Sequence, residues 1–120
     1  MSEQPSEIKL HQKSRLLEIA FSDGACFRLP YEFLRVYSPS ADVSGHGPGQ
    51  EVLQVGKKNV GVTGVVPAGS YAMQINFDDG HDTGLYSWEY LYKLGKNQVL
   101  MWQHYLDRLE VAGGSRELLR

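Results

Sequence analysis

Cysteine, excess positive charge and long apolar runs are what this chain has least of. Cys26 is the only cysteine among 120 residues, so neither an internal disulfide nor a site of several thiolates can form within one chain. The formal net charge of -2 provides no long-range positive field to attract nucleic acid or anionic lipid. No apolar run approaches the roughly 20 residues of a membrane span, and residues 1–12 lack the apolar core of a signal peptide. We therefore expect a cytoplasmic protein that binds neither nucleic acid nor membrane.

Complete catalytic motifs are missing as well. The chain contains no Gly-x-Ser-x-Gly elbow, and its glycine-rich segment 44–50 lacks the Gly-Lys-Ser/Thr ending of a phosphate-binding loop. Cys26 falls in the middle of a predicted strand, where a packed thiol is expected rather than a nucleophile. The sequence therefore predicts a binding domain and not an enzyme.

The composition is that of a globular chain. A hydrophobic content of 42% with 22% charged residues is ordinary for a folded domain and too apolar for a disordered one. We expect one domain over residues 1–120, with residues 1–6 and 113–120 as disordered tails.

A strand and turn pattern occurs twice. Alternating apolar residues at 16–21 lead into a turn at Asp23 and Gly24, then a second strand and a short helix at 31–37. The same order recurs 56 residues later, where residues 71–77 lead into Asp79 and Gly80, a short strand through Leu85 and a helix from Ser87. We interpret these segments as two strand–strand–helix units, although two amphipathic hairpins can also align by chance.

The remaining segments complete an α+β fold. Residues 59–66 are rich in β-branched side chains and are expected to pair with 71–77, with Gly64 allowing a bulge. Asn97 is expected to cap a C-terminal helix. The predicted apolar stripe of that helix is Val99, Trp102, Leu106 and Leu109. The predicted fold is a mostly antiparallel sheet from the two units plus this helix.

The turn after the second strand is the most informative local feature for function. His81 follows a turn glycine and lies between two carboxylates, and a neutral imidazole is a good ligand for zinc or iron. The candidate metal ligands are His81, His46, Asp79 and Asp82, with Glu51 as a further acid. This set requires the 44–50 loop to fold over the hairpin. The alternative is that His81 forms local hydrogen bonds that hold the turn.

A binding face is expected around the same turn. Ser87 can cap the following helix and Glu89 complements its positive end, so the turn is anchored by an aromatic helix. The expected members of the face are Gly80, His81, Tyr86, Trp88, Gly45, Gly47, Arg35 and Tyr37. The other interpretation of the aromatic residues is that they are core anchors. Lys57 and Lys58 are expected at a solvated loop end.

Three motifs in order resemble one family. They are Leu-Arg-Val-Tyr-Ser-Pro-Ser-Ala at 34–41, Gly-His-Gly-Pro-Gly-Gln at 45–50, and the segment 79–91 with Asp-Gly-His and Tyr-Ser-Trp. Together they resemble the gamma-butyrobetaine hydroxylase-like N-terminal domain, over most of the chain from about Ile8 to Leu94. The family includes free-standing bacterial proteins without an assigned role.

The resemblance also bears on metal binding. In the carnitine-synthesis hydroxylases, the domain holds a structural zinc through a Cys-x-Cys-x-x-Cys cluster and a later histidine. The matching positions here are Ser38, Ser40, Val43 and His81, so the resemblance implies that the cysteine-rich zinc site is absent. The oxygenase reaction belongs to a separate domain that needs two histidines and a carboxylate, and no His-x-Asp or His-x-Glu occurs here.

These observations lead to two functional hypotheses. The first is a non-catalytic binding or adaptor domain with a protein partner. Similar domains are also appended to Mrp-type ATPases that carry iron–sulfur clusters, which implies a link to metal or cluster handling. The second hypothesis is binding of a divalent metal, iron or zinc, through His81 and His46 with nearby carboxylates. The sequence specifies neither the partner nor the oligomeric state.

Overall fold

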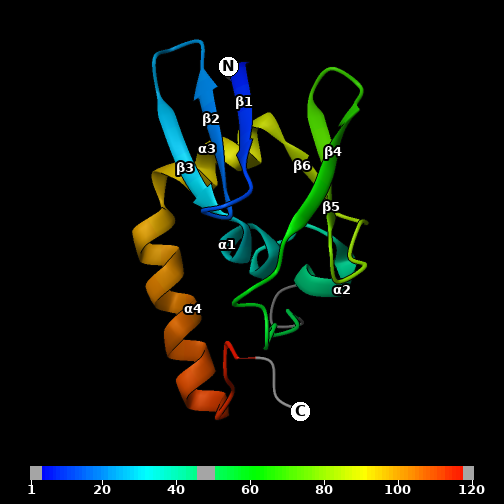
Figure 1. The fold of residues 1–120 in the computed structure, drawn as a ribbon. Coiled ribbons are helices and arrows are strands. Elements are labelled where there is room, and N and C mark those ends of the chain that lie inside the picture. The colour runs from blue at the N-terminus through cyan, green and yellow to red at the C-terminus, as the bar shows by residue number, and fades with distance from the viewer. Residues whose placement is uncertain (1–3, 46–50, 118–120) are drawn as a thin grey trace.

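The computed structural model describes residues 4–45 and 51–117, which form two three-stranded antiparallel sheets and four helices (Figure 1). The first sheet contains β1 (Pro5–His11), β2 (Leu16–Phe21) and β3 (Cys26–Pro30). The second contains β4 (Val62–Ala68), β5 (Ala72–Phe77) and β6 (Leu85–Ser87). The helices are α1 (Tyr31–Val36), α2 (Ala41–Ser44), α3 (Trp88–Lys96) and α4 (Gln98–Ala112). The predicted α+β class with a C-terminal helix is confirmed.

The two sheets have the same topology. Their strand orders are β1-β2-β3 and β4-β5-β6, and each first strand carries a bulge at the same place, between Pro5 and Glu7 and between Val62 and Gly64. We call β1–β3 with α1 the first unit and β4–β6 with α3 the second unit.

The backbone hydrogen bonds of the units also correspond. Phe21 N donates to Ala25 O (2.8 Å), and 56 residues later Phe77 N donates to His81 O (3.0 Å). The first N–H of each unit's helix likewise donates to the carbonyl that precedes the second strand, from Tyr31 to Arg15 and from Trp88 to Tyr71, both at 2.9 Å. Agreement of bulge, turn and helix start shows a structural repeat rather than a chance alignment.

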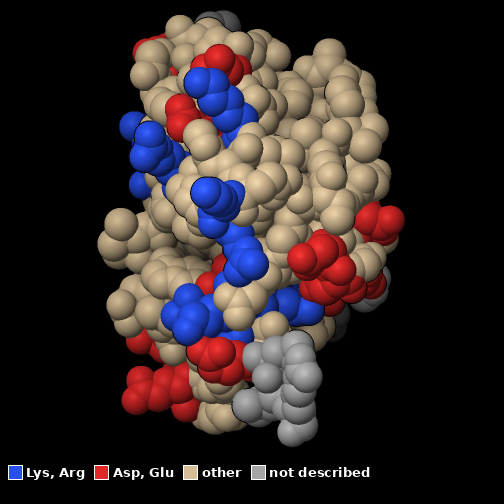
Figure 2. Space-filling view, in the orientation of Figure 1, with Lys and Arg blue, Asp and Glu red and all other residues tan. Residues whose placement is uncertain are grey.

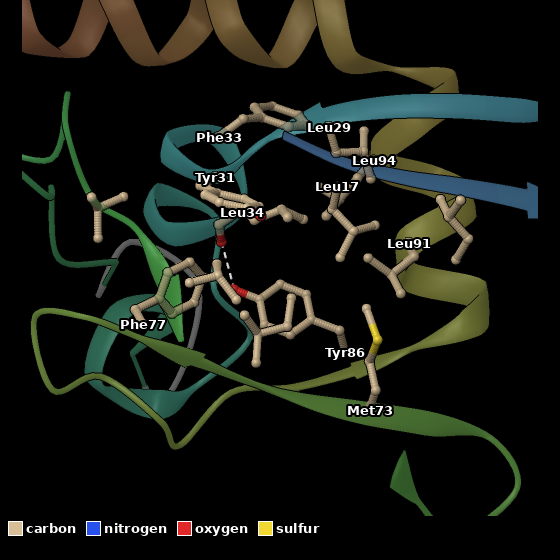
Figure 3. Close-up of a cluster of buried hydrophobic side chains, with 14 of the residues drawn as sticks. Leu17, Leu29, Tyr31, Phe33, Leu34, Met73, Phe77, Tyr86, Leu91 and Leu94 are labelled. Atoms are coloured by element: carbon tan, nitrogen blue, oxygen red, sulfur yellow. Dashed lines mark hydrogen bonds between the residues drawn. The ribbon is translucent and has the colours of Figure 1, made fainter. Parts of the chain in front are cut away.

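The inward faces of both sheets pack against α1 and α3 in one core. The alternating residues of β2 and β5 that face inward are almost fully buried; they are Leu17, Ile19, Phe21, Met73, Ile75 and Phe77. Burial of each such side chain contributes about 1.5–3 kcal/mol. Tyr86 lies at the centre, fully buried, and its hydroxyl donates to Leu34 O at 2.5 Å (Figure 3). This bond ties the second sheet to the helix of the first unit.

The helices differ in how their starts are stabilised. Ser87 caps α3 as predicted, with Oγ accepting from Tyr90 N at 3.0 Å. Asn97 occupies the cap position of α4, but its amide donates back to Lys93 O (2.9 Å) instead of capping the helix. The prediction for Val99 is wrong, because α4 packs through other residues and leaves this side chain 83% exposed.

Two further expectations, on the chain ends and on Cys26, are corrected. Ser6 belongs to β1, and Arg116 donates two hydrogen bonds of 2.8 Å to Glu32, so neither predicted tail is wholly disordered. Cys26 begins β3 instead of lying mid-strand, and its thiol is exposed. The longest helix in the described part of the chain, α4, has 15 residues, and none of the described helices combines the length and hydropathy of a membrane span.

Candidate functional site

The turn between β5 and β6 holds His81 in a fixed backbone position. Gly80 has φ +89°, a conformation that costs glycine little and other residues more. Its N–H donates to Phe77 O (3.2 Å), and His81 N donates to Asp79 Oδ1 (3.1 Å). The sequence Asp-Gly-His therefore forms the turn and places His81 next to the carboxylate of Asp79.

Asp79 is the centre of an ion-pair cluster. Its Oδ2 accepts from Arg35 Nε at 2.9 Å and from Lys57 Nζ at 2.6 Å. The Arg35 side chain is only 8% exposed, and Lys57 and Asp79 are 20% and 23% exposed. Burial alone raises the pKa of Asp79, but the hydrogen bonds from Lys57, the His81 N–H and Arg35 outweigh it and lower this pKa from 3.8 to about 2. The Asp79 carboxyl group therefore stays ionised at neutral pH.

His81 is held on its other side by hydroxyl groups. Its Nε2 lies 2.8 Å from Ser38 Oγ, which also accepts from Ser40 N at 3.2 Å. Ser40 Oγ in turn lies 2.6 Å from Thr83 Oγ1, and Thr83 donates to Asp42 Oδ2 at 3.3 Å. Burial, followed by the nearby Arg35 charge, lowers the pKa of His81. The imidazole is therefore neutral near pH 7 and part of a hydroxyl network.

These hydrogen bonds and ion pairs hold the turn in one conformation. Asp79 is a carboxylate far below its usual pKa, and His81 is a neutral ring whose pKa is moved away from neutrality. No buried side-chain polar atom in the described residues lacks a hydrogen-bond partner. The buried polar groups of this network are therefore satisfied by other groups of the chain.

The predicted metal ligands are only partly brought together. The backbone N–H of His81 donates to the Asp79 carboxylate, but that carboxylate is already engaged in ion pairs with Arg35 and Lys57. Asp82 is exposed, and His46 lies outside the described residues, as does Gly47. Within residues 4–45 and 51–117, no group of three or more His, Cys, Asp or Glu is placed to hold a metal ion.

The predicted binding face needs three corrections. Tyr86 is fully buried and Arg35 is 7% exposed, so neither can contribute a contact surface. Trp88 lies at a separate cleft, where it packs near Ile8 and its indole N–H donates to Ser70 O at 2.9 Å. Tyr37 is half-buried, and its hydroxyl donates to Met101 O at 2.6 Å.

Gly80, His81 and Gly45 remain near the surface of the turn region. Gly80 is exposed, while His81 and Gly45 are half-buried. Gly45 ends α2 with φ +75°.

Comparison with known proteins identifies the family. The sequence profile described as "Gamma-butyrobetaine hydroxylase-like, N-terminal" matches residues 8–92. The chain belongs to this family. Among curated proteins, none matches it significantly.

Solved structures of similar chains support the same assignment. Two structures described as "NMR solution structure of the protein" are 48% and 53% identical to this chain. They cover 100% and 99% of it and 94% and 89% of their own length, with TM-scores of 0.86 and 0.85. A crystal structure of a protein of unknown function in the DUF971 family, from Acidithiobacillus ferrooxidans, is 42% identical. It covers 77% of this chain and 92% of its own, with a TM-score of 0.65.

The zinc site known in hydroxylase members of the gamma-butyrobetaine hydroxylase-like family can be tested on the donor chemistry here. Ser38 lies beside His81 as the resemblance implies, but its hydroxyl is hydrogen-bonded to the ring, and the Ser40 hydroxyl is hydrogen-bonded to Thr83. Val43 is buried and has no donor atom. Neutral hydroxyls and an isopropyl group do not replace thiolates, so these residues do not fit that zinc.

Sequence reasoning named Arg35 for the binding face but missed the pairing of Lys57 with Asp79. Lys57 was expected at a solvated loop end, yet it pairs with Asp79, and Lys58 Nζ pairs with Glu117 Oε1 at 2.7 Å. Lys57 is 22 residues from Asp79 in sequence, so no local periodicity connects them. Ser38 did carry a signal, because the resemblance placed it with His81.

Proposed function

We propose that this chain is a non-catalytic binding or adaptor domain whose partner is a protein. Its working surface is the turn face, which we define as Asp42, Gly80, His81, Asp82 and Thr83. These residues are exposed or half-buried. Acidic side chains gather at this end of the second sheet in Figure 2.

The observation that supports the proposal is a partly buried ion-pair cluster that holds an exposed turn in place. Arg35, Lys57 and Asp79 form a partly buried charge cluster, and Asp79 belongs to the exposed turn that the cluster holds. A surface held in one conformation loses little entropy when a partner binds, which favours affinity. The pKa of Asp79 is lowered to about 2, far from neutral pH, which supports a structural role for this carboxylate over proton transfer.

The test is affinity capture with matched charge reversals. Asp82→Lys changes the turn face, and Glu110→Lys changes an equally exposed position on α4. The tagged proteins are mixed with lysate of the source cells, and retained proteins are quantified by mass spectrometry. The proposal predicts a protein that wild type and Glu110→Lys retain and Asp82→Lys loses. Purified, this protein must bind the chain directly with the same preference. Equal retention by all three forms would contradict the proposal.

Divalent metal binding is the second candidate, supported by the state of one residue. Burial keeps His81 neutral, which is the form that binds iron or zinc. The experiment is titration with ferrous iron and zinc while the amide and imidazole NMR signals are followed. Metal binding at this site predicts a saturable response at micromolar metal that disappears in His81→Ala. An unsaturable response, or one that His81→Ala leaves unchanged, counts against it.

A further inference from the structure

A groove of about 260 Å³ lies where all four helices meet. Its walls include Tyr37 at the C-terminal end of α1, Tyr90 from α3, Met101 from α4, and Val52 from the segment that follows the glycine-rich loop. Val52 is 52% exposed. Ser38 also lines the groove and contacts His81, so the groove adjoins the turn face.

The neutral polar groups of this groove are already engaged. The Tyr37 hydroxyl donates to Met101 O and the Tyr90 hydroxyl donates to Tyr37 O, both at 2.6 Å. Ser44 Oγ donates to Ser40 O at 2.9 Å. These bonds point the phenols and the serine toward the backbone, so the groove offers mainly ring faces and aliphatic surface to a ligand.

The charged side chains that line the groove have no ion-pair partner in the part of the chain that the structure describes. Lys93 and Arg108 both line it, and neither forms an ion pair with any residue that the structure describes. Outside the groove, Arg35, Lys57, Lys58 and Arg116 are paired, whereas Lys13, Arg15 and Lys96 also lack an ion pair among the described residues. Glu51 also lines the groove and is likewise unpaired among the described residues. The groove therefore carries one excess positive charge on a chain of net charge -2.

A larger cavity of about 430 Å³ shows why open charges matter. It lies beside Phe33 and Trp102 and contains the Glu32–Arg116 pair. There the two side chains bind each other through two bonds of 2.8 Å, and Arg116 also stacks over Trp102. Those charges are neutralised within the chain, so this cavity has no preference for a charged ligand.

We propose that the groove binds an acidic segment of the protein partner. An apolar side chain of that segment inserts against Tyr37, Tyr90 and Val52, and flanking carboxylates bind Arg108 and Lys93. The volume is below the roughly 300–1,000 Å³ of small-molecule sites, which favours one inserted side chain over a whole cofactor. Arg108 provides a planar fork that matches a carboxylate. The inference rests on the proposed adaptor function and specifies the chemistry of its partner.

Fluorescence polarisation with a defined peptide tests this inference. The probe is a fluorescein-labelled peptide with a central phenylalanine flanked by two glutamates on each side, and the comparator has glutamine at all four positions. We expect saturable binding of the acidic probe and about tenfold weaker binding of the comparator, which corresponds to one lost charge-assisted contact. The difference must shrink as salt is raised.

Variants assign the binding to individual residues. Arg108→Gln should weaken the acidic probe about tenfold, and the more exposed Lys93→Gln about threefold. Glu51→Gln removes the opposing carboxylate and should tighten binding about twofold. Arg28→Gln is the matched control, because its side chain is 72% exposed on the first sheet and outside the groove. Circular dichroism and thermal melting confirm that each variant is folded.

Three results would overturn the inference: no saturation of the acidic probe below millimolar protein, equal binding of the glutamine comparator, or unchanged binding by Arg108→Gln. The capture experiment separates this failure from failure of the adaptor function. If Asp82→Lys still abolishes capture of a partner but the acidic probe does not bind, the adaptor function is supported and only the proposed role of the groove is rejected.

Discussion

The first and second units have nearly the same backbone but very different outer surfaces. In the first sheet, Lys9, Glu18 and Arg28 lie side by side across the three strands. The equivalent row of the second sheet is Val66, Gln74 and Leu85. Figure 2 shows this contrast, with charged side chains over β1–β3 and an uncharged surface over β4. Register and burial preserve the inner faces, whereas outward positions are free to diverge.

The two turns show a similar divergence at the candidate site. Tyr92 donates to Asp23 Oδ2 at 2.5 Å, and Arg35 donates to Asp79 Oδ2 at 2.9 Å. Tyr92 and Arg35 occupy equivalent positions in α3 and α1, so each turn carboxylate contacts the helix of the other unit. Only the second turn also receives a lysine, Lys57. A structural contact shared by both units has become an ion-pair cluster in one of them.

The largest difference between the units in the free energy of unfolding should appear when two equivalent glutamates, Glu32 and Glu89, lose their charge or their partner. Glu32 is 7% exposed and paired with Arg116, whereas Glu89 is exposed. Arg116→Ala leaves Glu32 without its cation and should lower the free energy of unfolding by about 2–3 kcal/mol, less than a fully buried pair because Arg116 is 37% exposed. Glu89→Gln should change it by less than about 0.5 kcal/mol. Urea unfolding measures both.

A second substitution in the Arg116→Ala chain checks the cause of that loss. Glu32→Gln removes the stranded charge and should restore part of the stability. A loss below about 1 kcal/mol for Arg116→Ala alone would show that water already compensates Glu32.

A smaller effect is expected at a contact that occurs in both units. Phe27 faces Gly95, and at the equivalent positions Ser38 faces Gly84. A Cβ on Gly95 would lie 2.3 Å from Phe27 Cγ, so Gly95→Ala should cost about 1–2 kcal/mol after the gain in helix propensity. Thermal unfolding of a double-mutant cycle tests the cause. In a Phe27→Ala background, Gly95→Ala should cost less than about 0.5 kcal/mol; an unchanged cost would rule out the clash.

Local features of this fold could be predicted from sequence because they depend on neighbouring residues. The two Asp-Gly turns, the Gly64 bulge and the Ser87 cap all follow from residues within a few positions of one another. The family resemblance added the contact between Ser38 and His81, which are 43 residues apart.

Features set by packing could not be predicted in this way. Tyr86 and Leu85 are both large and apolar, and only the register of β6 with β5 decides that Tyr86 is buried and Leu85 half-exposed. Val99 fits a helical stripe, but α4 packs through Met101, Trp102, Tyr105 and Leu109 and leaves Val99 exposed. The Asp79 cluster joins Arg35 and Lys57 across 44 and 22 residues, beyond any local pattern.

The two turn aspartates should differ in their effect on acid stability. The pKa of folded Asp79 is about 2, below its ordinary value of 3.8. The stability that it contributes is therefore present above about pH 4 and lost as the pH falls toward 2. Allowing for its 23% exposure, Asp79→Asn should cost about 1–2 kcal/mol at pH 7, and Asp23→Asn less.

Urea midpoints between pH 2 and 7 test this difference. Wild type and Asp23→Asn should lose stability in this acid range more steeply than Asp79→Asn, which lacks the titrating carboxylate. Identical slopes for wild type and Asp79→Asn would show that the cluster does not hold Asp79 ionised.

The smallest effect is expected from moving the charged row of the first sheet onto the second. Val66 and Leu85 are 47% and 48% exposed, and the strands place them at the positions of Lys9 and Arg28. The triple variant Val66→Lys, Gln74→Glu, Leu85→Arg should therefore unfold within about 0.5 kcal/mol of wild type, because cross-strand ion pairs offset the lost apolar contacts. Ile75→Glu, one position away on the buried face, should destabilise by several kcal/mol. A one-residue shift of register exchanges the two faces of a strand. Urea unfolding measures the stability of both variants. Comparable losses of stability for the two would mean that the outer side chains of the second sheet are packed, and that the two units do not share one register.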